Sequence, residues 1–163
     1  MTRHGDPARL ARAAWRALPG DLLGHLVVRL AGARVTRRVE VDGVGEVILA
    51  EGSRLAPWLD RVPRRPTAMT FGGVVVARVR LSDALVRHEA EHVRQWSALG
   101  PLFLPAYLVA SVVARSRGDD RYRGNALEAA AFAAEDLPRA VRPLDGYDTD
   151  RPSTDRSSGS PRA

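Results

Sequence analysis

Residues 82–100 read SDALVRHEAEHVRQWSALG and carry most of the structural information in this chain of 163 residues. Ser82 followed by Asp83 is a typical helix start, because the hydroxyl caps free backbone N–H groups and the carboxylate favours the positive end of the helix. Gly100 is a typical helix stop. The segment therefore predicts one helix that begins at Ser82 and ends at about Leu99.

Two histidines lie four positions apart in this helix, in the sequence His88-Glu89-Ala90-Glu91-His92. Residues i and i+4 share one helix face, so both imidazoles can reach the same ion. The carboxylate beside the first histidine, Glu89, can then take a proton from a water molecule at that ion. The motif predicts a metal site with two histidine ligands and Glu89 as its general base.

The helical wheel separates the two acids of the motif. At about 100° per residue, Glu91 lies near Arg87 and Arg94, which indicates a solvated face with salt bridges. Glu89 falls within the apolar arc near Trp96, where a carboxylate needs a compensating partner such as a cation. The alternative is that both histidines are structural and that Glu89 pairs with an Arg in the core.

A zinc site of this kind needs a third protein ligand. Asp119 and Asp120 follow a predicted helix end and are expected in solvent, while His25 lies in an amphipathic stretch and is expected to serve packing. Glu128 lies in a helix that Asn125 can cap, among Ala and Leu residues, where an acid needs a partner. Glu128 is therefore the expected third ligand.

These residues resemble the HExxH zinc metallopeptidases, or zincins, and in particular their gluzincin branch, in which a Glu on a downstream helix completes the metal site. The sequence is also similar to short, uncharacterised bacterial HExxH proteins over roughly residues 68–135. The matching positions lie in the segments His88–Trp96, Gly100–Phe103 and Tyr122–Glu128.

The resemblance implies a zinc ion held by His88, His92 and Glu128, with Glu89 as the general base of a small metallopeptidase. Its substrate would be a peptide or a protein. The alternative functions are a metal-binding domain without catalysis and a membrane-surface interaction domain. A general base at position 89 favours the enzyme, because a structural zinc site needs none.

The resemblance also directs attention to the surroundings of the ion. Tyr122 is the expected catalytic donor to an oxyanion, and Tyr107 is the next candidate. Several gluzincins carry an acid four residues after the ligand Glu, where this chain has Phe132. Support of the ligand histidines is therefore expected from Glu135 or from backbone carbonyls.

The remaining pattern predicts an α+β fold, with a small antiparallel sheet packed on three to four helices, and the resemblance implies that this is a minimal zincin-like architecture. Residues 37–50 alternate around Asp42-Gly43 and predict a hairpin. Residues 68–80 predict a further strand, and its part 74–80 is expected at the sheet edge, beside a peptide substrate. The other expected helices span residues 7–31, with a break at Pro19-Gly20, residues 101–117 and residues 126–137.

Composition divides the chain into three regions. Residues 1–36 are expected to form a basic N-terminal helical segment and residues 138–163 a disordered tail, while the resemblance implies that residues 37–137 form a zincin-like metal-binding core. The absence of Cys excludes disulfides and thiolate metal sites, and the absence of Lys excludes Schiff-base chemistry.

The net positive charge of the chain comes from its N-terminal residues. Residues 1–38 contain eight Arg against Asp6 and Asp21, and this net +6 equals the net charge of the whole chain. The central region is neutral and the basic segment has a single aromatic residue, so no nucleic-acid partner is expected. Any peripheral association with an anionic membrane is expected to involve this segment, and the alternative is that the arginines only solvate a helix that packs on the core.

The segment Trp96–Ala114 contains 19 residues without a charge. Because Gly100-Pro101 and Pro105 interrupt it, a buried core helix is expected, and a membrane-spanning or re-entrant segment is the alternative. A secretory signal is not recognisable, so the expected location is cytoplasmic, with membrane association as an addition. The sequence does not indicate an oligomeric state.

Overall fold

The computed structural model of the chain describes residues 7–144, and side chains from residue 19 onward. The protein has the predicted α+β fold, with helices around a five-stranded sheet in the order β3-β4-β2-β1-β5. The elements are α1 (Pro7–Leu30), β1 (Arg37–Val41), β2 (Gly45–Glu51), η1 (Ser53–Leu55), α2 (Ala56–Leu59), β3 (Ala68–Phe71), β4 (Val74–Ala77), α3 (Asp83–Leu99), η2 (Gly100–Leu102), α4 (Phe103–Ser116), α5 (Ala126–Glu135) and β5 (Val141–Pro143).

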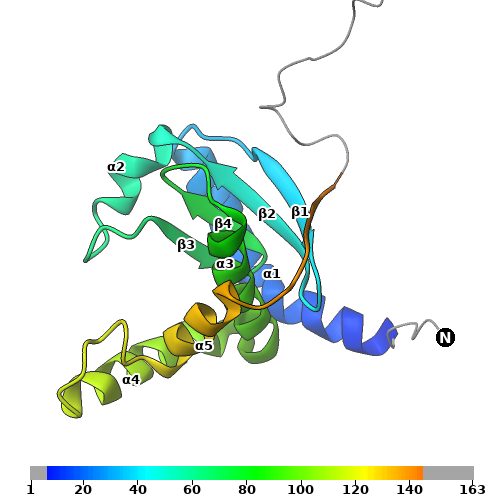
Figure 1. Cartoon of the computed structure of the whole chain (residues 1–163). Coiled ribbons are helices and arrows are strands. Elements are labelled where there is room, and N and C mark those ends of the chain that lie inside the picture. The colour runs from blue at the N-terminus through cyan, green and yellow to red at the C-terminus, as the bar shows by residue number, and fades with distance from the viewer. Residues whose placement is uncertain (1–6, 145–163) are drawn as a thin grey trace, which may run out of the picture.

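The sheet lies between two layers of helix, with α3 on one face and α1 on the other (Figure 1). Successive side chains of a strand point to opposite faces, so the same strands serve both cores. Val75 packs in the cluster with Val86 and Ala90 of α3, whereas Val74 and Val76 pack in the cluster with the end of α1 and with α2. This arrangement fixes α3 firmly against the sheet.

The predicted hairpin is present, since β1 and β2 are antiparallel and joined through a turn in which Gly43 has φ +77°. Residues 68–80 differ from the prediction, because the chain reverses at Gly72 and forms the two antiparallel strands β3 and β4. β3 takes the edge, and β4 is internal and parallel to β2. The edge position predicted for residues 74–80 was therefore wrong, and the sheet is mixed.

Helix α1 continues through Pro19, so the predicted break at this position was wrong. The helix is supported by a close approach to the turn between β3 and β4. A Cβ atom on Gly20 would collide with the backbone of Gly72, and the backbone N–H of Gly73 donates to the Asp21 carboxylate. A proline removes one helical hydrogen bond, and this packing offsets the loss.

The segment after α5 crosses α3 and then pairs with β1 (Figure 1). Val141–Pro143 is thus a strand in a region predicted to be disordered, while residues 145–163 lie outside the described part of the chain. Arg139 in this segment pairs with Glu91, which also pairs with Arg94. Glu91 is therefore buried, and its predicted position on a solvated face was wrong.

Helices α3, α4 and α5 were predicted at nearly the observed bounds. Ser82 caps α3, since its hydroxyl accepts from the N–H of Leu85, and Gly100 ends it with φ +58°. The prediction that Trp96–Ala114 forms a buried core helix was wrong for α4, in which Phe103 and Ala114 are buried and most other residues are not.

Candidate metal centre

Helix α5 is positioned by its cap residue, Asn125, which is fully buried. Its side-chain oxygen accepts from the N–H of Leu127, and its amide nitrogen donates to the carbonyl of Tyr107 and the hydroxyl of Ser111. The cap therefore ties the beginning of α5 to α4. It also places the first turn of α5, which contains Glu128, opposite α3.

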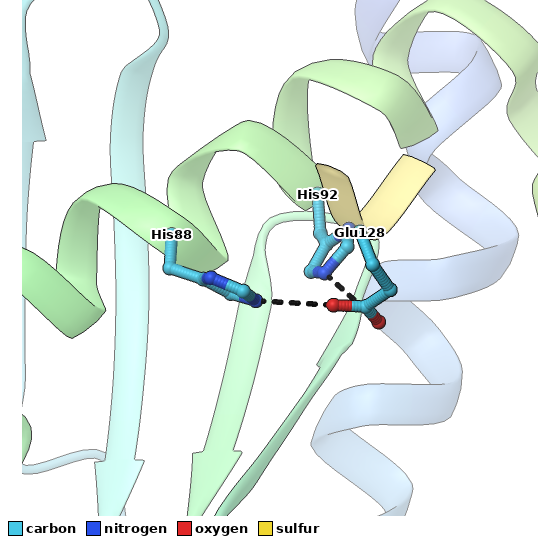
Figure 2. A group of neighbouring side chains, drawn as sticks. All are labelled: His88, His92 and Glu128. Carbon is cyan, nitrogen blue, oxygen red and sulfur yellow. Dashed lines mark ion pairs between the residues drawn. The ribbon is translucent and has the colours of Figure 1, made fainter. Parts of the chain in front are cut away.

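Three side chains meet where α3 and α5 pack together. His88 and His92 project from one face of α3 toward Glu128 of α5 (Figure 2). His88 Nε2 lies 3.4 Å from Glu128 Oε2, and His92 Nε2 lies 3.6 Å from Glu128 Oε1. One potential ligand atom from each residue lies within 4.8 Å of the others, and all three residues are buried. This His-His-Glu cluster could hold a metal ion.

The outer nitrogen of each imidazole is held by a hydrogen-bond partner. His88 Nδ1 lies 2.8 Å from Glu135 Oε1, and His92 Nδ1 lies 2.9 Å from Gln95 Oε1. The Gln95 amide nitrogen donates to the carbonyl of Leu127, so its oxygen is the acceptor toward His92. In its neutral form, each ring therefore carries its proton on Nδ1, which directs the Nε2 lone pair at Glu128.

With both rings neutral, this arrangement brings acceptors together, because neither imidazole donates to Glu128 and the Tyr107 hydroxyl donates to its Oε1 atom only. Two Nε2 lone pairs face the Glu128 carboxylate, and Glu128 Oε2 is a buried oxygen without a hydrogen-bond partner among the described residues. Buried polar atoms are normally satisfied, and a buried carboxylate needs a compensating charge. A cation coordinated by the two Nε2 atoms and the carboxylate would supply both.

The pKa shifts of the two histidines and of Glu128 also indicate that the cluster favours a positive charge. Burial lowers the pKa of His88 and His92, but the protonated rings can donate to Glu128 and are attracted by the charge of Glu89, and these effects outweigh burial, so both pKa values are raised. Burial raises the pKa of Glu128, but the two histidines and Tyr107 outweigh it and bring this pKa down to about 2. The cluster thus favours a positive charge beside an ionised carboxylate.

Glu89 lies beside the cluster and is buried, as the helical wheel predicted. Its Oε2 atom accepts a hydrogen bond of 2.6 Å from the hydroxyl of Thr70 on strand β3. Trp96 of α3 also binds Thr70, because its indole N–H donates to the Thr70 carbonyl. Glu89 is therefore held by Thr70 beside both histidines.

Three aromatic side chains border the cluster. The Tyr107 hydroxyl donates to Glu128 Oε1 over 2.5 Å. Burial is the main cause that raises the pKa of Tyr107, and the Glu128 carboxylate raises it further. Burial and the charges of Glu128 and Glu89 raise the pKa of Tyr122, which is partly exposed. The Phe132 ring packs edge-on against both His88 and Tyr122. Phe132, noted above as a departure from the gluzincin pattern, thus packs against a candidate ligand.

The other candidate ligands are not in the cluster. Asp119 and Asp120 are exposed, and Asp120 accepts from the backbone N–H groups of Tyr122 and Arg123. His25 is exposed on α1. Sequence reasoning named Glu135 as a support for a histidine but missed Gln95 and Thr70. Gln95 could have been predicted, because it lies three residues after His92 on the same helix and therefore on a neighbouring part of its surface. Thr70 could not, because it lies on strand β3 and contacts Glu89 only through the packing of α3 on the sheet.

Comparison of the chain with protein-family models, with curated proteins and with solved structures finds no match. The α+β fold with a buried His-His-Glu cluster is therefore the class that the structure defines, and its chemistry rests on the geometry alone.

Proposed function

We propose that the protein is a zinc-dependent hydrolase, and specifically a small metallopeptidase. The observation that carries this proposal is the pair of Nε2 lone pairs directed at a Glu128 carboxylate with an unsatisfied oxygen. Two imidazoles and one carboxylate are a donor set that suits Zn²⁺ and leaves a coordination position for water or substrate. When bound, zinc lowers the pKa of a water molecule and polarises a substrate carbonyl.

Within this proposal, Glu89 takes the proton from the attacking water. Its carboxylate is held by Thr70 and lies beside both histidines, so it is oriented before substrate arrives. A proton then passes from Glu89 to the leaving amine. Tyr122, partly exposed and close to both carboxylates, is the better candidate to donate to the oxyanion, because the Tyr107 hydroxyl already donates to Glu128.

The sheet supports an extended peptide as the substrate. β3 is the edge strand, and the residue that holds Glu89, Thr70, is part of it. A peptide that adds to this edge by main-chain hydrogen bonds would lie beside the general base. In this proposal the strand that pairs with the peptide substrate is β3, and not residues 74–80 as the sequence had predicted.

The test is a comparison of Glu89→Gln with the unmodified protein, both loaded with one equivalent of zinc. The amide keeps the shape of the carboxylate but cannot accept the proton, so peptide hydrolysis should fall by at least about 100-fold while zinc remains bound. Elemental analysis and cleavage of a mixed peptide library measure the two properties. Equal hydrolysis by both proteins would refute the role of Glu89.

A second candidate is a metal site that only stabilises the fold. The burial of His88, His92 and Glu128, none more than 7% exposed, favours this alternative, since a substrate must reach the ion. It predicts that zinc binds and raises the melting temperature, that no peptide is cleaved and that Glu89→Gln changes nothing but stability. The same pair of measurements therefore distinguishes the two functions.

A further inference from the structure

Helix α4 has an apolar surface that faces away from the rest of the protein. In Figure 1 the helix extends away from the sheet. Leu108, Val109 and Val112 are each more than 60% exposed, and Leu102 in the preceding turn is 67% exposed. Leu104 and Val113 are exposed beside them. At about 100° per residue these positions cover half of the helix circumference, and apolar patches of this kind mark interaction surfaces.

The opposite side of α4 is fixed to the metal centre. Phe103 and Ala114 are buried, the Tyr107 hydroxyl donates to Glu128, and Ser111 accepts from Asn125. These inner residues recur every three or four positions and form one stripe. The helix therefore cannot rotate its leucines and valines into the core of the described residues, which leaves this face open to a partner.

The occupant that fits this surface is a lipid bilayer. In the described residues, Asp83–Ser116 is the one helical stretch long and apolar enough to cross a membrane by length and composition. Its first part, α3, packs against the sheet, so only α4 is available to lipid. With 14 residues α4 is about 21 Å long, whereas a hydrocarbon core is about 30 Å thick. It is too short to span, and its fixed inner stripe keeps it parallel to the surface.

Charge complementarity supports the same occupant. No charged residue occurs in Trp96–Ala114, and Arg115, Arg117, Arg121 and Arg123 follow it within nine residues against Asp119 and Asp120. These four arginines are exposed. Arginines at the end of an apolar helix can reach anionic headgroups while the apolar side chains enter the acyl region.

We propose that the outer face of α4 (Leu102, Leu104, Leu108, Val109, Val112 and Val113) inserts into one leaflet of an anionic membrane, with the arginines of residues 115–123 at the headgroups. The protein is then bound to the membrane surface without crossing it, and the metal centre lies directly behind the inserted helix. The charge pattern predicted membrane contact through the N-terminal segment, of which residues 1–6 and the side chains of residues 7–18 lie outside the described part of the chain, and this proposal adds α4 as a contact.

The absence of cysteine allows a direct test. Leu108→Cys and Val112→Cys each provide a single site for an environment-sensitive fluorophore, and Leu22→Cys on α1 is a matched control with 69% exposure. On mixing with vesicles of phosphatidylglycerol and phosphatidylcholine, the labels at positions 108 and 112 should shift to shorter wavelength and brighten. The label at position 22 should not change. A response at position 22 alone would overturn the proposal.

Vesicle co-sedimentation of unlabelled variants gives the quantitative test. Leu108→Ser combined with Val112→Ser should lower partitioning by about tenfold or more, because two large apolar side chains leave the bilayer. Leu22→Ser combined with Leu30→Ser removes equally exposed side chains from α1 and should leave partitioning unchanged. Neutral vesicles should bind more weakly than anionic ones, and Arg115→Gln with Arg117→Gln should reduce this difference.

Two results contradict the proposal. One is a failure of the unmodified protein to bind either kind of vesicle. The other is a dimer in sedimentation equilibrium that Leu108→Ser with Val112→Ser converts to monomer, which would identify a second copy of the chain as the occupant. Neither result depends on the metal or on hydrolysis, so the proposal stands apart from the proposed enzymatic function.

Discussion

Glu51 at the end of strand β2 and Glu128 in the first turn of α5 are both buried carboxylates, with 4% of each side chain exposed. Glu51 is fully satisfied, because Arg37 donates to both of its oxygens, the backbone N–H of Leu81 donates to Oε1 and the hydroxyl of Thr36 donates to Oε2. Glu128 receives one hydrogen bond, from Tyr107, and its other oxygen has no partner among the described residues.

The difference separates an acid whose oxygens are all paired within the protein from an acid whose remaining partner could be a metal ion. Glu51 already has its countercharge, and its contacts join β1, β2 and the approach to α3. Glu128 faces two imidazole lone pairs, so its countercharge must come from a proton or from a metal ion. Burial alone therefore does not distinguish the two roles, whereas the inventory of donors around each carboxylate does.

The largest expected effect on stability is at Glu51. Glu51→Ala leaves Arg37 buried without its partner and should lower the free energy of unfolding by about 3–5 kcal/mol. Glu128→Gln should change it by about 1 kcal/mol or less in the metal-free protein, since the amide no longer confronts the lone pairs as an anion. Urea denaturation at pH 8 measures both. Equal losses would remove the distinction between the two acids.

The pH dependence should differ between metal-free and zinc-loaded protein. The pKa values of His88 and His92 are raised above their ordinary value of 6.5 in the metal-free fold. Their contribution to stability is therefore complete below pH 6.5 and is lost as the pH rises through the folded pKa. Zinc competes with the same protons, so its affinity should increase with pH, by up to about tenfold per unit for each histidine.

Thermal denaturation from pH 6 to pH 9, with and without zinc, measures these opposite trends. The melting temperature of the metal-free protein should fall over this range, while the increase produced by zinc should grow. A zinc effect that is constant with pH would show that the ion binds elsewhere than at the two imidazoles.

The partners of the outer nitrogens should have a smaller effect. Gln95→Ala removes the acceptor that orients His92 and should weaken zinc binding by about 10–100-fold without abolishing it. Glu135→Gln should act similarly on His88. Competition with a zinc chelator gives the affinities, and His25→Ala on α1 is the control that should leave them unchanged. An unaltered affinity in Gln95→Ala would mean that His92 does not bind through Nε2.

The smallest effect on stability is expected from removal of one arginine partner of Glu91, a third buried acid that pairs with both Arg94 and Arg139. Burial raises its pKa, but the hydrogen bonds from Arg94 and Arg139 outweigh it and hold the pKa below the ordinary value. Arg94 is half exposed and Arg139 remains, so Arg94→Ala should lower the free energy of unfolding by less than about 1 kcal/mol. A loss as large as that of Glu51→Ala would contradict this ranking.

The parts of the site that follow local rules were predictable from the sequence. The cap at Ser82, the stop at Gly100 and the cap at Asn125 each depend on a few adjacent residues, and they place His88, His92 and Glu128 on two helices. That these helices meet at the site was inferred from the apolar surroundings of Glu128, and the resemblance to gluzincins implied the same. The structure adds the geometry, including the distances from both Nε2 atoms to Glu128.

The parts that depend on distant segments were not predictable. The burial of Glu91 requires Arg139, which lies 48 residues away in the sequence. The edge position of β3 depends on the reversal at Gly72 and on the parallel pairing of β4 with β2. An apolar run such as that of α4 shows only that water is unfavourable, and it does not show whether protein or lipid replaces the water.

Zinc stoichiometry in the unmodified protein and in Glu128→Gln is the most direct test of the central claim. After removal of metal and dialysis against excess zinc at pH 8, the unmodified protein should retain about one zinc per chain, and Glu128→Gln should retain none at micromolar protein. Asp119→Asn, which changes an exposed acid outside the cluster, should retain the ion. Zinc bound equally by the unmodified protein and by Glu128→Gln, or by neither, would contradict the assignment of Glu128, His88 and His92 as one metal centre.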